Sequence, residues 1–147
     1  MTTTERVQES RLRPDWVDRE AYPFESRYVA LDAGTVHYVD EGESGLGEPT
    51  LVFLHGNPTW SFLYRHLVRG LSGEYRCVAP DHLGFGLSDH PEGFSYLPSD
   101  HAAVFEAFVD ELGLEDLVLV VQDWGGPIGL SYAADNPENV RALVVMN

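Results

Sequence analysis

The stretch Leu119-Val-Val-Gln-Asp-Trp-Gly-Gly126 decides the fold of this chain. Its apolar first half predicts a buried strand over residues 117–122, and the glycine pair predicts a sharp turn into a helix over 126–135 that Asn136-Pro137 ends. A carboxylate, Asp123, lies at the bend. Chains that present a nucleophile on a strand-to-helix turn usually carry serine there, in the pattern G-x-S-x-G. A carboxylate in that position indicates that an ester forms on the protein by displacement at a saturated carbon.

Asp123 also has a simpler interpretation. An aspartate between a strand and a helix is commonly an N-cap, which accepts hydrogen bonds from the first helical N–H groups. Gly125 and Gly126, however, allow a tight turn and a close approach of the helix to the strand. Trp124 places an indole beside the carboxylate, which a plain N-cap does not need. We therefore expect Asp123 to be a nucleophile and keep the N-cap as the alternative.

Two further segments each combine an apolar strand with a turn. Residues 50–55 predict a strand that leads into Gly56-Asn-Pro-Thr-Trp60, and residues 75–79 predict a strand before the glycine loop over 81–89. When parallel strands alternate with helices, the loops at their carboxyl ends meet at one edge of the sheet. In proteins with a nucleophile on such a turn, the loop after the first of these strands supplies one N–H group of the oxyanion hole.

The rest of the chain completes an alternating α/β pattern. Residues 1–24 are polar and predict an N-terminal arm, and residues 25–147 predict the core domain. Apolar residues at helical spacing predict a helix over 99–112, with Ser99 as its cap. The other expected elements are strands over 27–31, 36–40 and 141–146, a hairpin turn over 32–34, a loop over 41–49 and a helix over 61–71.

The composition is strongly acidic. The 147 residues are enough for one domain with a sizeable core, and 24 acidic residues against nine arginines and no lysine give a formal net charge of −15. This charge argues against partners such as nucleic acid and anionic membranes. Because the acids are scattered, we interpret them as the surface of a halophilic protein that stays soluble in concentrated salt, with an ordinary acidic protein as the alternative.

Other classes of site and location are not indicated. Cys77 is the only cysteine, so no intramolecular disulfide is expected. No signal peptide is recognisable and no apolar run approaches the ~20 residues of a membrane span, which predicts a cytoplasmic protein. The six histidines lack the spacing of metal ligands, and His55 is expected to brace the loop that follows it. Gly84-Phe-Gly86 is not followed by the third glycine of a dinucleotide fingerprint, so neither a metal nor a cofactor is expected.

Three motifs carry a family resemblance: His55-Gly-Asn-Pro-Thr-Trp60, Asp81-His-Leu-Gly-Phe-Gly-Leu-Ser-Asp89 and Val121-Gln-Asp-Trp-Gly-Gly126. In this order and spacing they resemble the haloalkane dehalogenases of the α/β-hydrolase superfamily. The resemblance runs from about Tyr22 to the last residue and covers the N-terminal half of such an enzyme. It implies the α/β-hydrolase fold, a mostly parallel sheet flanked by helices, cut after the sixth strand and without the lid.

The resemblance also implies a reaction. Asp123 would attack the carbon of a small halogenated aliphatic substrate, and water would later hydrolyse the alkyl ester. The indole of Trp124 and the side-chain amide of Asn57 would bind the departing halide, and the backbone N–H groups of the same two residues would form the oxyanion hole. Asn57 has an alternative interpretation, because asparagine before proline is a common turn residue.

The family's base and acid have no counterpart in this sequence. The catalytic histidine of the family lies after the eighth strand, and in some branches the acid ends the sixth strand, where this chain has Asn147. We therefore expect no turnover by these 147 residues and expect self-association through the open edge of the strand over 141–146. The alternatives are an epoxide hydrolase or another α/β-hydrolase, and a non-catalytic binding fragment.

Overall fold

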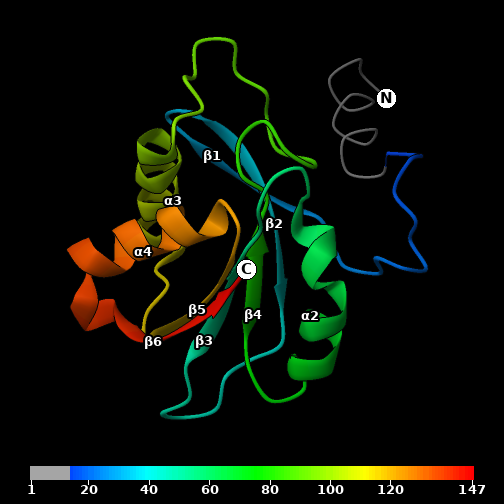
Figure 1. Ribbon diagram of the computed structural model, residues 1–147. Helices are drawn as coiled ribbons and strands as arrows, with labels where there is room; N and C mark the ends of the chain where they lie inside the picture. Colours follow the sequence, from blue (N-terminus) through cyan, green and yellow to red (C-terminus); the bar gives the residue numbers. More distant parts are fainter. Residues whose placement is uncertain (1–13) are drawn as a thin grey trace.

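Within residues 14–147, six strands form one sheet in the order β1-β2-β4-β3-β5-β6 (Figure 1). The computed structural model describes residues 14–147. Strands β1 and β2 pair antiparallel, as do β2 and β4, whereas β3 pairs parallel with both β4 and β5, and β5 pairs parallel with β6. The predicted, mostly parallel sheet of the α/β-hydrolase fold is thereby confirmed. The strands are β1 Arg27–Leu31, β2 Gly34–Glu41, β3 Thr50–Leu54, β4 Cys77–Pro80, β5 Leu117–Gln122 and β6 Val140–Met146.

Helices cover both faces of this sheet. Figure 1 shows α3 (Pro98–Leu112) and α4 (Gly125–Asp135) on one face and α2 (Arg65–Leu71) on the other. The side chains of β3 point alternately to the two faces of the sheet, because successive side chains of a strand lie on opposite sides. Val52 and Leu54 belong to the core under α3 and α4, whereas Leu51 and Phe53 belong to the core that includes residues of α2. The central strands β3 and β4 are therefore buried on both sides, as their continuous apolar sequences require.

Some boundaries differ from the predictions. Ser99 is not the cap of α3: the helix begins at Pro98, and its N-cap Leu97 makes no side-chain hydrogen bond. Proline is tolerated in the first helical turn, because the N–H groups of that turn have no acceptor within the helix and the lack of one costs nothing. The helix expected over 61–71 is a 3-10 helix, Ser61–Tyr64, followed by α2. A short 3-10 helix, Pro137–Asn139, separates α4 from β6.

The described part of the predicted N-terminal arm packs against the core. Residues 1–13 of that arm lie outside the described residues. Val17, Tyr22 and Phe24 are buried in the same apolar core as Tyr64, and the hydroxyls of Tyr22 and Ser61 lie 2.6 Å apart. The domain boundary at residue 24 stays a prediction.

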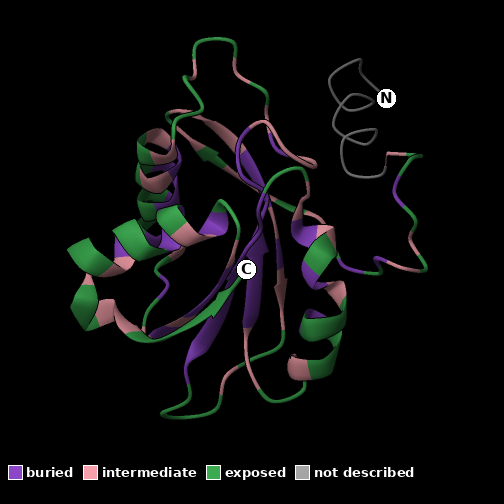
Figure 2. Ribbon diagram, viewed as in Figure 1, coloured by how far each residue is buried: buried purple, intermediate pink, exposed green. Residues whose placement is uncertain are grey.

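Strand β6 lies at one edge of the sheet with little cover. Figure 2 shows it exposed, whereas β5 beside it and β3 beyond β5 are buried. Four consecutive apolar residues are 37 to 63% exposed: Leu143, Val144, Val145 and Met146. Because neighbours in a strand point to opposite sides, both faces of β6 are open. Within residues 14–147, no helix has the length and apolarity to cross a membrane.

Candidate active site

Asp123 occupies a strained turn between β5 and α4. Its φ is +51°, in the left-handed region that non-glycine residues rarely adopt. The following residues allow this turn to press against the sheet. A Cβ atom on Gly125 would lie 2.2 Å from the carbonyl oxygen of Leu54, and one on Gly129 would lie 2.6 Å from Val121 Cγ1. Gly126 has open space around it, so of the two glycines in the motif only Gly125 is required by close packing.

The Asp123 carboxylate contacts the loop after β3. Its Oδ1 accepts a hydrogen bond from the backbone N–H of Asn57 at 2.8 Å. Hydrogen bonds from the backbone N–H groups of Asn57 and Trp124 hold the pKa of this carboxyl below its ordinary value. The N-cap of α4 is Trp124, and no side-chain hydrogen bond caps the helix. The N-cap interpretation of Asp123 is therefore wrong, and the carboxylate is ionised at neutral pH.

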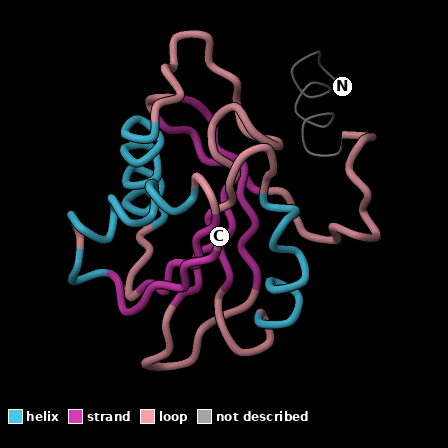
Figure 3. Tube along the Cα trace, viewed as in Figure 1, coloured by secondary structure: helices cyan, strands magenta, loops and turns pink. Residues whose placement is uncertain are grey.

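Gly56 brings the loop after β3 to this carboxylate. A Cβ atom at Gly56 would lie 2.4 Å from Cβ of Asp123, so only glycine permits the approach. The next peptide bond, between Asn57 and Pro58, is cis. Figure 3 shows the loops after β3, β4 and β5 gathered beyond the same end of the sheet. The structure thus brings together Asn57, Asp123 and Trp124, the three residues predicted for the site.

A cavity of about 350 Å³ lies beside the Asn57 loop, and Asp123, although bonded to Asn57, is not one of its lining residues. Asn57 and Trp124 both line it, and the Trp124 side chain is half-exposed. Within residues 14–147, neither the Asn57 side-chain amide nor the Trp124 indole makes a hydrogen bond, so both donors are available to a ligand. The remaining lining is largely aromatic or glycine: Gly56, His82, Gly84, Phe85, His90, Tyr96, His101 and Ile128.

Two buried histidines join the loops around this cavity. His55 donates from Nδ1 to its neighbour's carbonyl, Gly56 O, at 2.8 Å, and its Nε2 accepts the His82 backbone N–H at 2.9 Å. His82 donates in turn from Nε2 to the carbonyl of His55 at 2.9 Å. Burial lowers the pKa of both imidazoles, so they are neutral at neutral pH. His55 braces its loop as predicted, whereas nothing in the sequence pattern identified His82 as its partner.

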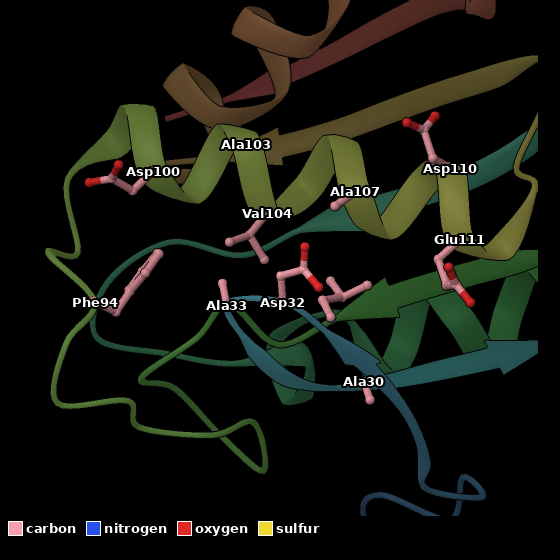
Figure 4. Close-up of a pocket in the computed structure, with 11 residues that line it drawn as sticks. Ala30, Asp32, Ala33, Phe94, Asp100, Ala103, Val104, Ala107, Asp110 and Glu111 are labelled. Carbon is pink, nitrogen blue, oxygen red and sulfur yellow. The ribbon is translucent and has the colours of Figure 1, made fainter.

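A second and larger cavity lies elsewhere. It has a volume of about 640 Å³ and lies between the β1–β2 turn and α3 (Figure 4). Its floor is made of small apolar side chains such as Ala103 and Ala107, and carboxylates surround it. It shares no lining residue with the cavity beside Asn57 and holds neither a nucleophile on a strained turn nor a cluster of donors. Among the described residues, no group of three or more acids, histidines or cysteines is arranged to bind a metal ion.

Comparison with known proteins agrees with this geometry. The family model for the alpha/beta hydrolase fold matches residues 49–147. Haloalkane dehalogenase 2 of Mycobacterium tuberculosis is 49% identical over 130 residues, which are 88% of this chain and 44% of that protein. The cis-3-alkyl-4-alkyloxetan-2-one decarboxylase of Shewanella oneidensis is 44% identical over 128 residues, 85% of this chain and 39% of that protein.

A solved structure matches a similar share of this chain. The haloalkane dehalogenase DatA from Agrobacterium tumefaciens superposes with a TM-score of 0.75 at 36% identity, over 82% of this chain and 40% of that one. The chain spans less than half the length of the curated relatives it matches. The fold, the glycine-lined turn at Asp123 and the matched family model lead to one conclusion: this chain belongs to the α/β-hydrolase family.

Proposed function

We propose that this chain forms the nucleophile-bearing half of a haloalkane dehalogenase, which cleaves carbon–halogen bonds by hydrolysis through an alkyl ester on Asp123. One observation carries the proposal. The ionised Asp123 carboxylate accepts the Asn57 N–H beside a cavity that is lined by the side chains of Asn57 and Trp124, and neither side chain makes a hydrogen bond within residues 14–147. A carboxylate nucleophile beside donors for an anion suits a substrate that releases halide.

In the first step a new carbon–oxygen bond replaces the carbon–halogen bond. One oxygen of Asp123, Oδ1, is held by Asn57 N–H, and the other attacks the carbon that bears the halogen. The halide leaves with the bonding electron pair, and the Asn57 amide and the Trp124 indole stabilise its growing charge. The lowered pKa keeps Asp123 in the reactive, deprotonated form at neutral pH. No electron is gained or lost, so the step needs no redox cofactor.

In the second step water releases the alcohol. Water attacks the ester carbonyl carbon of Asp123. The backbone N–H groups of Asn57 and Trp124 stabilise the negative charge that develops on Oδ1. Deprotonating this water requires a base, and the family resemblance assigns that role to a histidine after an eighth strand. We propose small halogenated aliphatic compounds as substrates and the cytoplasm as the location.

One alternative is favoured by a specific similarity. The Shewanella relative is named for decarboxylation of an oxetanone, a strained ring that contains oxygen. A carboxylate that opens an epoxide leaves an alkoxide on the substrate, which needs a proton donor, whereas opening an oxetan-2-one at its saturated carbon leaves a carboxylate on the substrate. Neither reaction releases a halide ion. The free donors of Asn57 and Trp124 favour halide release. Binding of free bromide by the cavity would separate the two functions.

The function is tested by counting the halide released. Incubated with 1-bromohexane, the folded 147-residue chain is expected to release one equivalent of bromide per chain and then stop, because ester hydrolysis lacks its base. The Asp123→Asn variant should release none, since an amide is a poor nucleophile. Bromide measured by ion chromatography over time gives both the stoichiometry and the rate.

Two outcomes would contradict this expectation. Equal bromide release from the wild-type chain and Asp123→Asn would assign the reaction to another group. Absence of release from a chain whose circular dichroism shows a folded α/β protein would contradict Asp123 as a nucleophile for alkyl halides.

The open edge of β6 predicts self-association of the isolated chain. Its unpaired backbone groups and exposed apolar residues Leu143 to Met146 offer a template for another strand. Sedimentation velocity at low and multimolar KCl should show dimers or larger species. At low salt the charge of −15 opposes association, and screening in concentrated salt removes that repulsion, so the associated fraction should rise with salt. A monomer in both conditions, with the amides of β6 protected from exchange, would show that another segment covers the edge.

A further inference from the structure

Asp81 is a fully buried carboxylate that joins three segments of the chain. It lies directly after β4, and both of its oxygens accept hydrogen bonds. Oδ1 accepts the backbone N–H of Ser61 at 2.8 Å, and Oδ2 accepts the backbone N–H of Leu87 at 3.0 Å and the His37 Nδ1–H at 2.8 Å. A single side chain thereby links β2, the start of the helical segment after the Asn57 loop, and the glycine loop.

His37 fixes Asp81 from the neighbouring strand β2. Its ring is fully buried, and its other nitrogen, Nε2, lies 3.1 Å from Ser26 Oγ. The backbone N–H of His37 donates to Ser88 Oγ at 2.8 Å, and that hydroxyl donates to the carbonyl of Asp81 at 2.7 Å. The pair therefore has a defined geometry, unlike a surface ion pair whose two side chains move freely. Neither His37 nor Asp81 lines the cavity beside Asn57.

The charge of Asp81 is stabilised in place. Burial alone would raise the pKa of its carboxyl, but the hydrogen bond from His37, together with that from the Leu87 N–H, lowers the pKa below its ordinary value. The Tyr22 hydroxyl is a further titratable group that interacts with this carboxylate. Gly86 permits the glycine loop to close on this charge, since a Cβ there would lie 2.3 Å from Asp81 Oδ2.

The loop that carries Asn57 is held at both ends. At its start, His55 ties Gly56 to the glycine loop through Gly56 O and His82 N–H. At its end, the Ser61 N–H is tied to Asp81. Asn57 lies between these two anchors, and its own N–H donates to Asp123. The direction of that N–H therefore depends on where Asp81 holds Ser61.

From this geometry we infer that His37 and Asp81 form a positioning pair, which holds the Asn57 loop so that the Asn57 N–H points at the Asp123 carboxylate. The inference rests on the proposed role of Asp123, but it concerns a hydrogen bond that is present before any substrate binds. Neither residue touches the reacting atoms, so both act through Ser61 and Asn57. Nothing in the proposed chemistry otherwise requires a buried His–Asp pair between β2 and the residue after β4.

The test distinguishes loss of the hydrogen bond between Ser61 N–H and Asp81 from a general loss of stability. Ser61→Pro removes the N–H that Asp81 accepts, at the first position of the 3-10 helix, where proline is tolerated. The backbone of Trp60 is extended, as a residue before proline requires. Ser61→Ala is the matched control, because it loses the same hydroxyl and its contact with Tyr22 but keeps the N–H. A second series compares His37→Leu with His37→Asn, whose side-chain N–H takes the place of Nδ1–H.

Two readouts are taken on isotope-labelled protein by NMR without substrate: the exchange rate of the Asn57 amide and the pKa of Asp123 from its side-chain carbon. In Ser61→Pro and His37→Leu, the Asn57 amide should exchange roughly tenfold faster, as expected for one lost hydrogen bond, and the pKa of Asp123 should rise toward its ordinary value. Ser61→Ala and His37→Asn should keep both values close to wild type. Val39→Ala, a core substitution on the same strand, should lower stability and leave both unchanged.

The contrary results are equally specific. An unchanged Asn57 amide and an unchanged pKa of Asp123 in folded Ser61→Pro would overturn the inference. So would equal changes in Val39→Ala, because the effect would then follow general stability. If His37→Leu does not fold, the comparison of Ser61→Pro with Ser61→Ala alone tests the inference. Since no reaction is measured, a chain that never releases bromide still gives a clear answer about the positioning pair.

Discussion

Replacing Asn57 with alanine is expected to slow the alkylation of Asp123 by roughly 10²-fold. The side-chain amide is a free donor that lines the cavity, and loss of a donor to developing charge costs ~2.7–4 kcal/mol in enclosed sites. The lower end of that range applies here, because the side chain of the second donor, Trp124, is 46% exposed and water partly replaces a lost contact. Trp124→Phe, which removes the indole N–H and keeps an aromatic ring, should show an effect of similar size.

The Asn57 substitution also separates two roles of one residue. Its backbone N–H, which donates to Asp123, is retained in alanine, so the pKa of the Asp123 carboxyl should stay low. Binding of bromide, followed by quenching of tryptophan fluorescence, should weaken in parallel with the rate of bromide release. A normal rate and normal quenching in both Asn57→Ala and Trp124→Phe would place the halide site elsewhere.

Gly125→Ala is expected to destabilise the protein by about 3 kcal/mol or more. The new Cβ would lie 2.2 Å from the backbone oxygen of Leu54, and no side-chain rotation can relieve a contact with backbone. Gly126→Ala is the matched control on the same helix turn, since nothing lies within 4 Å of its added Cβ. It should be neutral or stabilising, because alanine is the better helix former by about 1 kcal/mol.

Urea unfolding followed by circular dichroism measures both free energies of unfolding. The two alanines add the same atoms to the same turn, so their difference reports the close approach of α4 to β3. Equal stability of Gly125→Ala and Gly126→Ala would mean that the turn at Asp123 does not press against Leu54 as the structure shows.

Local patterns in the sequence were sufficient to predict most of the fold. The alternation of apolar strands, glycine turns and amphipathic helices predicted the sheet and placed the loops at 56–60, 81–89 and 123–126 at one edge. These features depend on residues that are close in the sequence, because strand and helix periodicity are local properties. The close contact of Asn57 with Asp123, 66 residues apart, followed from the rule that the carboxyl ends of parallel strands meet.

Features that depend on tertiary packing were not predictable in the same way. Ser99 has the residue type of a cap, but the path of the preceding chain makes Pro98 the first helical residue. The pairing of His37 with Asp81 joins residues 44 positions apart, one on β2 and the other directly after the antiparallel strand β4, and no short motif indicates that register. The N-cap alternative for Asp123 failed because its φ of +51° turns the side chain toward Asn57. In each case the deciding contact comes from a distant part of the chain.

The most direct test is to locate the ester itself. After incubation with 1-bromohexane, intact-mass measurement should find one added hexyl group on the folded chain, and peptide mapping should place it on Asp123. The Asp123→Asn variant should carry none. A hexyl group found only on another residue, such as a surface histidine, or its absence from a demonstrably folded chain, would contradict Asp123 as the nucleophile.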